Sequence, residues 1–225
     1  LYTHLSACRI RQPRSSAQLV AGQGGLTPAS LMEILRDHGA GNQENTLWHP
    51  APANPNMLCM HAGFGPTRNS QSVGSMVMHL DGDLDTAWVT GTSAPCTSLF
   101  KPVWLKAGLP DVGALPQGTY STETLWWSHE KLHRSLLKDY PARSALLMKR
   151  KNAIESEFIQ GISQLPDRRT RTLLDYSSSC FERATAFETE ILPLIQGVPA
   201  RDRLPILYRM AWGKFTREAN FSLVS

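Results

Sequence analysis

The chain has 225 residues, of which 41% are hydrophobic and 19% charged, with a formal net charge of +4. This length can bury one large core or two small ones, and the ordinary composition is typical of a globular protein rather than a disordered one. No apolar run approaches the length that spans a bilayer, and the first residues do not form a signal peptide. The basic residues are dispersed and no aromatic residues interleave with them, so we expect neither a membrane span nor a nucleic-acid partner.

The first regular element that the pattern predicts is an amphipathic helix from Thr27 to His38. Thr27 would be its N-cap, Pro28 would occupy its first turn and Gly39 would stop it. A loop rich in Asn and Pro follows between Gly39 and Asn56.

The stretch from Met57 to Leu105 has the pattern of adjacent β-strands. Residues 73–80 and 86–92 are rich in strand formers, and Asp81-Gly82-Asp83 between them predicts a hairpin turn. Small polar residues then crowd positions 90–96, where the backbone could approach another group closely. This end of the strands is therefore a candidate position for a functional site.

The composition changes once, near Gly118, and the pattern after it is helical. Apolar residues recur at helical spacing over Leu125–Leu136, Leu147–Leu165 and Leu173–Leu194, and Gly197 with Pro199 should end the last helix. We therefore predict an α+β chain, with strands over residues 1–117 and a helical region of the same domain over 118–225. The stripe from Leu173 to Leu194 could pack against another subunit as readily as against its own core, which leaves a homo-oligomer open.

The string His129-Glu130-Lys131-Leu132-His133 matches the H-E-x-x-H pattern of zinc peptidases. In that pattern the two histidines bind zinc and the glutamate activates the bound water. No third ligand follows at the usual spacing, so Glu155 or Glu157 would have to supply it from a second helix. We interpret both histidines as packing or interhelical hydrogen-bonding residues, with a zinc peptidase as an alternative.

The four cysteines are widely scattered and include no C-x-x-C pair; they are Cys8, Cys59, Cys96 and Cys180. This spacing favours reduced thiols in a cytoplasmic protein, although two disulfides stay open. His61 and His79, which should end apolar strands, are interpreted as core or edge histidines. We expect no metal site.

Several short sequence motifs of the chain match those of one known family. They are Cys59-Met60-His61, Gly74-Ser75-Met76-Val77, the run WVTGTSAPC from Trp88 to Cys96, Phe100-Lys101-Pro102-Val103, Leu125-Trp126-Trp127, His129-Glu130, Leu132-His133-Arg134 and, upstream, Leu31-Met32 with Leu35 to His38. In these motifs the chain resembles the secernins, members of the dipeptidase family of N-terminal-nucleophile (Ntn) hydrolases, over roughly its first two thirds. One departure is Gln71-Ser72-Val73, where the family word is Gln-Thr-Thr.

The resemblance implies a partial Ntn αββα sandwich and a cysteine hydrolase that cleaves amide bonds in small peptides without a cofactor. In this chemistry the thiol of an N-terminal cysteine attacks the carbonyl, and its own α-amino group is the base. Leu1 cannot do this, and Cys8 precedes Arg9 where the family has a small or acidic residue. We therefore expect the chain to be an inactive fragment whose nucleophile lies upstream. Because secernins are also associated with exocytosis, a non-catalytic interaction protein is the alternative.

The resemblance also suggests residues that recognise the substrate. Arg68, Gln71 and Ser75 are predicted to bind a substrate carboxylate or carbonyl, since a guanidinium pairs well with a carboxylate. The alternative for Arg68 is a loop arginine in solvent. Thr92, with Ser93 and Cys96, could add hydroxyl or backbone contacts, but a tight turn explains them equally well.

Overall fold

The structure is a computed structural model that describes residues 8–39, 48–52, 57–65, 68–200 and 204–221. Within these residues the fold is mixed, with six α-helices and one small antiparallel sheet, as the α+β prediction requires at this level. The helices in chain order are α2 (Cys8–Ala21), α3 (Pro28–Leu35), α4 (Leu125–Leu136), α5 (Tyr140–Gly161), α6 (Thr170–Gly197) and α7 (Ile206–Glu218), and the short 3-10 helices are η1 (Leu105–Ala107) and η2 (Ile162–Gln164).

The three strands of the sheet follow one another in space as they do in sequence. β1 (Met76–His79) pairs antiparallel with β2 (Thr86–Val89), which pairs antiparallel with β3 (Lys101–Val103). The predicted hairpin is confirmed, and Gly82 has a φ of +82° in its turn, a conformation that glycine adopts without strain. Both of its strands are shorter than predicted.

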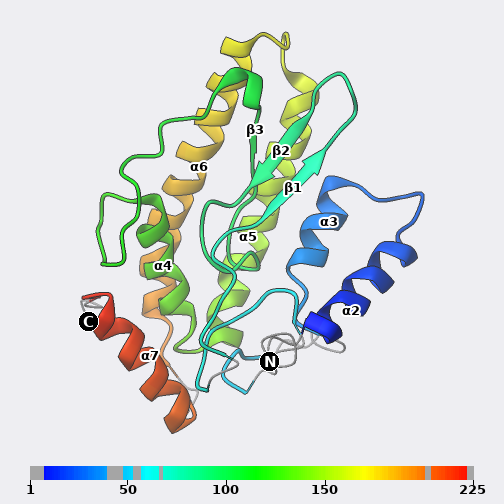
Figure 1. The fold of residues 1–225 in the computed structure, drawn as a ribbon. Helices are drawn as coiled ribbons and strands as arrows, with labels where there is room; N and C mark the ends of the chain where they lie inside the picture. The colour runs from blue at the N-terminus through cyan, green and yellow to red at the C-terminus, as the bar shows by residue number, and fades with distance from the viewer. Residues whose placement is uncertain (1–7, 40–47, 53–56, 66–67, 201–203, 222–225) are drawn as a thin grey trace.

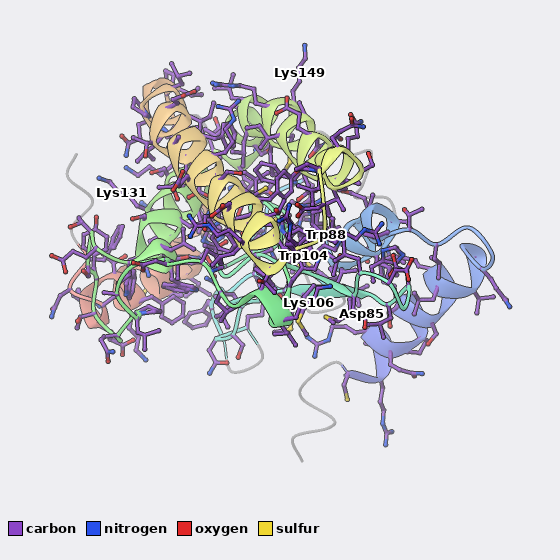
Figure 2. All side chains as sticks on the ribbon, turned by 90° about the horizontal axis from the view of Figure 1, so that it is seen from above. Asp85, Trp88, Trp104, Lys106, Lys131 and Lys149 are labelled. Carbon is purple, nitrogen blue, oxygen red and sulfur yellow. The ribbon has the colours of Figure 1, made fainter. Side chains whose placement is uncertain are left out.

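The longer helices flank the sheet. Helix α6 lies along β3, α3 lies beside β1, and α5 runs next to α6 (Figure 1). Seen from above, Trp88 and Trp104 lie between the strands and the long helices, whereas Lys149 projects outward from α5 (Figure 2). Both indoles are buried. The Trp104 Nε1 donates to the Thr86 Oγ1 at 2.9 Å, whereas the Trp88 Nε1 has no hydrogen-bond partner among the described residues.

Helix α3 begins as its sequence predicts. The Thr27 Oγ1 accepts from the Ser30 N–H, and the Ser30 Oγ accepts from the Thr27 N–H, which forms a reciprocal capping box. The helix ends at Leu35, three residues before the predicted end, because the next residues make tertiary contacts instead. The Asp37 carbonyl accepts the Leu58 N–H at 3.0 Å, so residues 36–38 turn toward that loop.

The three helices predicted after Gly118 are confirmed as α4, α5 and α6. On α6 the predicted stripe is buried from Leu173 to Ile191, but Leu194 is 56% exposed and Ile195 takes its place in the core. A spacing of 22 residues stays closer to whole turns of a helix with 3.6 residues per turn than one of 21 does. From Cys180 to Ile195 the stripe packs within its own chain, in a core that also includes Leu136, Leu147 and Ile154, whereas Leu173 packs with Leu84 and Trp104.

Helices α2 and α7 were not predicted. The predicted helix end at Gly197 is confirmed for α6, but α7 follows it, so α6 is not the last helix. Helix α2 contains Pro13 and buries none of its residues, whereas α7 buries only Tyr208 and Ala211. Neither helix therefore carries the apolar periodicity on which a sequence-based prediction depends.

The predicted loop between Gly39 and Asn56 falls largely on 40–47 and 53–56, outside the described residues. The described residues 57–65 around His61 form a loop, which corrects the expectation that His61 ends a strand. Among the described residues, no helix is both long and apolar enough to cross a membrane.

Candidate functional site

Gln71 is the predicted recognition residue that lies at a pocket. The pocket has a volume of about 360 Å³ and is lined by Ala62, Asn69, Ser70, Gln71, Val73, Trp126, Glu130, Arg134, Trp212 and Phe215. The Gln71 Nε2 donates to the Glu130 Oε2 at 3.3 Å, while its buried Oε1 has no hydrogen-bond partner among the described residues. The pocket thus combines aromatic walls with a carboxylate, a guanidinium and one unused amide oxygen.

Arg68, Ser75 and Thr92 do not line this pocket. The Arg68 guanidinium is half-buried and donates to the Pro50 and Ala51 carbonyls at 2.6 and 2.8 Å, so it is not the solvent-exposed arginine of the alternative interpretation. These bonds occupy its two terminal nitrogens with main-chain acceptors.

Of the other two predicted residues, Thr92 belongs to the backbone turn after β2, whereas Ser75 directly precedes β1 and is hydrogen-bonded to that turn. The Ser75 N–H donates to the Thr90 Oγ1 at 2.9 Å, and the buried Thr92 Oγ1 donates to the Ser98 Oγ at 2.8 Å. The small polar run therefore supports a close turn, in which Ala94 has a φ of +54°.

Glu130 is the centre of a buried hydrogen-bond network at the base of the pocket, which we call the Glu130 network. Its carboxylate is bound by Gln71, by the Ser93 Oγ at 2.6 Å, by the Arg134 Nε at 2.9 Å and by the His133 Nδ1 at 3.2 Å. Burial alone would raise the pKa of Glu130, but the charges of His133 and Arg134, with these hydrogen bonds, outweigh it and lower the pKa to about 2. The carboxylate is therefore ionised at neutral pH.

His129, the first histidine of the H-E-x-x-H string, makes interhelical contacts. Its Nδ1 lies 2.7 Å from the Glu188 Oε1 on α6, and its Nε2 lies 3.2 Å from both the Thr97 and Ser98 hydroxyls. This arrangement agrees with the interpretation of His129 as an interhelical hydrogen-bonding residue.

Of the two glutamates that could have completed a zinc-peptidase site, one is bound to an arginine and the other faces solvent. Glu155 forms a buried ion pair with Arg36, and Glu157 is exposed on α5. In the part of the chain that the structure describes, neither histidine of the string belongs to a group of three potential metal ligands.

Such a group occurs elsewhere, and we call it the thiol–imidazole cluster. It consists of His38, Cys59, His61 and Cys96, whose ligand atoms all lie within 4.8 Å of one another. The His61 Nε2 is 3.5 Å from the Cys59 Sγ, 3.4 Å from the Cys96 Sγ and 3.2 Å from the His38 Nε2. These four side chains could hold a metal ion, which was not expected from the sequence.

Main-chain hydrogen bonds bring the cluster together from three segments. The Leu58 and Cys59 N–H groups both donate to the Asp37 carbonyl at 3.0 Å, which places the loop of Cys59 against the residue before His38. The Ser72 and Ala94 backbones are joined at 2.7 Å, and Ser72 also pairs with Met60, which brings the turn of Cys96 to the same place.

The thiols and imidazoles of the cluster shift one another's pKa values. Burial lowers the pKa of His61 to about 4, so its imidazole is neutral at pH 7. Burial raises the pKa of Cys59 well above its ordinary value, and its hydrogen bond with Cys96 adds to that. Burial opposes ionisation of Cys96 too, but its contacts with Cys59, His61 and His38 lower its pKa well below the ordinary value.

A buried ion pair between Arg36 and Glu155 holds the backbone next to the cluster. The Arg36 guanidinium makes two hydrogen bonds to the Glu155 carboxylate, at 2.6 and 2.7 Å, and its remaining nitrogen donates to the Pro95 carbonyl at 3.0 Å. The Phe100 N–H also donates to Glu155 at 2.8 Å. Arg36 thus joins the end of α3 to α5 and to the turn before Cys96.

The sequence pattern alone does not place the four residues of the cluster together. Cys59 and His61 stand two apart, a spacing that could have suggested a pair of ligands, but His38 and Cys96 lie 21 and 35 residues away. Tertiary contacts of Arg36, Asp37 and Ser72 bring these segments together. The contiguous H-E-x-x-H string, in contrast, matches a known metal motif directly, although it lacks a third ligand.

No protein-family model matches this chain, and no curated protein matches it either.

Proposed function

We propose that this chain is part of a secernin-like Ntn cysteine hydrolase that cleaves amide bonds in small peptides, with its nucleophilic cysteine upstream of Leu1. The pocket at Gln71 carries the proposal, because a residue chosen on the family resemblance lies there beside groups suited to a small peptide. The strands β1 to β3 would belong to the partial αββα sandwich that the resemblance implies. The proposed reaction is acyl-enzyme formation on the upstream thiol, followed by hydrolysis by water.

The pocket offers partners for several groups of a dipeptide. The Arg134 guanidinium lines the pocket beside the ionised Glu130 and suits a terminal carboxylate. The unused Oε1 of Gln71 can accept the peptide N–H, and the indoles of Trp126 and Trp212 can cover an apolar side chain. These groups would recognise the substrate, whereas the upstream cysteine would react with it.

Binding can be tested on this chain without the nucleophile. We expect a dipeptide with free ends to change the fluorescence of Trp126 and Trp212, and Gln71→Ala to weaken its binding roughly tenfold, the value of one hydrogen bond. Gln160→Ala, which removes an exposed glutamine from α5, is the matched control and should leave binding unchanged. Equal affinities of both variants would count against the pocket.

The proposed activity would require a protein that carries the nucleophilic cysteine in addition to this chain. We expect hydrolysis of dipeptides once a cysteine is exposed at the mature amino terminus, and none after that cysteine is changed to Ala. A protein that hydrolyses no peptide amide, yet retains a partner after the same substitution, would instead support the interaction protein linked to exocytosis.

A further inference from the structure

We propose that the thiol–imidazole cluster is a structural zinc site. The proposal is independent of the hydrolase, because it rests on the four side chains themselves and needs neither a nucleophile nor a substrate.

The spacing of the ligand atoms fits a tetrahedral zinc ion. With Zn–S bonds of about 2.3 Å and Zn–N bonds of about 2.0–2.1 Å, neighbouring ligand atoms of a tetrahedron lie roughly 3.3–3.8 Å apart. The three distances from the His61 Nε2, at 3.2, 3.4 and 3.5 Å, lie in or next to this range. One ion at the centre would therefore reach its ligands with only small movements of the side chains.

The ligand types favour zinc over the harder cations. Two thiolates and two neutral imidazoles form the Cys₂His₂ set of structural zinc sites, whereas magnesium and calcium prefer oxygen ligands. Two thiolates also balance the charge of a divalent ion, so the occupied site would be neutral within the core. Both cysteines would bind the metal as thiolates.

The surroundings of the cluster favour a structural role over a catalytic one. The Cys59 and Cys96 side chains are 0% and 1% exposed, so no substrate can reach either sulfur. The Tyr140 hydroxyl donates to the Cys96 Sγ at 3.3 Å, and the His38 ring stacks on Trp48 with centroids 3.7 Å apart. Partners of this kind orient metal ligands, and four protein ligands leave no open position for a reacting water.

The site would join segments that are far apart in sequence. His38 follows α3, Cys59 and His61 lie on the loop that leads toward Gln71, and Cys96 lies on the turn before β3. Zinc would hold these segments together and so stabilise the loop that forms one side of the pocket. Metal binding should accordingly be coupled to folding of this part of the chain.

The test is metal analysis of the 225-residue chain, purified under reducing conditions with zinc present. We expect about one zinc ion per chain by mass spectrometry of the metal content. Cobalt in place of zinc should show the strong visible absorption of tetrahedral coordination and a thiolate-to-cobalt charge-transfer band. Because these measurements use the unaltered chain, they do not depend on the folding of any variant.

Single substitutions then assign the ligands. Cys59→Ser or Cys96→Ser should lower the zinc content roughly tenfold or more at a fixed chelator concentration. Cys180→Ser is the matched control, because Cys180 is equally buried but lies on α6 outside the cluster, and it should retain the metal. His129→Ala should also retain it.

Three results would overturn the proposal. The first is a reduced, folded chain that takes up neither zinc nor cobalt. The second is a metal content that depends on His129 but not on Cys59, which would move the ion to the H-E-x-x-H string. The third is a Cys59–Cys96 disulfide that forms in place of metal binding and leaves a chain that binds no metal after reduction.

Discussion

Two buried groups of polar side chains lie next to each other in this molecule and differ in how their atoms are satisfied. The rings of His61, in the thiol–imidazole cluster, and His133, in the Glu130 network, have centroids 5.8 Å apart. In the Glu130 network, hydrogen-bond donors from four side chains point at one carboxylate. In the cluster, two sulfurs and two ring nitrogens point at one another.

This difference indicates which of the two histidine-containing groups should bind a cation. A buried carboxylate that is surrounded by donors and a guanidinium is already neutralised, so a metal there would have to displace Arg134. Metal-ligand atoms that converge on one point, without hydrogen-bond donors and a guanidinium around them, would be stabilised most by a cation at that point. The H-E-x-x-H string resembles a metal motif in sequence, but the cluster resembles a metal site in space.

The largest expected effect on stability comes from the buried ion pair of Arg36 and Glu155. Arg36→Ala should lower the free energy of unfolding by about 3–5 kcal/mol, because it leaves the buried Glu155 carboxylate without its cation. Urea unfolding measures this loss. Arg150→Ala breaks a half-exposed pair with Glu190 and should cost no more than about 1 kcal/mol. Similar losses in both variants would show that Arg36 does not support the cluster as described.

The Glu130 network should make stability depend on acid. The pKa of Glu130 is about 2 in the folded chain against an ordinary value of 4.5, so the unfolded chain binds the proton more readily. The resulting stabilisation, on the order of 3 kcal/mol, is complete above about pH 4.5 and is lost as the pH falls toward 2.

This dependence can be measured by urea unfolding between pH 7 and pH 3. Glu130→Gln should flatten the dependence over that interval, because glutamine does not titrate there. If the variant and the unaltered chain lose stability in parallel, other carboxylates carry the acid sensitivity and the Glu130 network is less strongly coupled than its contacts indicate.

A smaller effect separates charged from neutral hydrogen bonds in the core. Ser93→Ala removes a donor to the ionised Glu130 and should cost about 2 kcal/mol. Ser177→Ala removes an equally buried hydroxyl that donates to the neutral Pro102 carbonyl, and should cost about 1 kcal/mol. Thermal unfolding of the two variants compares them, and an equal loss would contradict an ionised Glu130.

The sequence was sufficient to predict elements whose signals are local. The cap at Thr27, the hairpin turn at Gly82 and the apolar stripes of α4, α5 and α6 each depend on neighbouring residues, and the structure contains all of them. Helices α2 and α7 bury few or none of their side chains, so they gave no periodic signal.

The candidate sites were harder to predict for a different reason. Gln71 was named on the resemblance alone, and its contact with Glu130 joins residues 59 positions apart. The thiol–imidazole cluster depends on the early end of α3, which a pattern of apolar residues cannot show because the contacts of Arg36 and Asp37 determine it. Tertiary contacts that override a helical pattern thus position His38.

The smallest expected effect tests whether α3 and the cluster are independent. Thr27→Ala removes one side of the capping box and should lower the free energy of unfolding by about 1 kcal/mol. Because Arg36 and Asp37 fix the other end of this helix by tertiary contacts, the affinity of the cluster for zinc should not change. Chemical unfolding and a chelator titration on the same protein measure the two quantities. A cap variant that loses zinc as readily as Cys59→Ser would show that His38 is positioned by the helix as a whole, and not by the contacts at its carboxyl end.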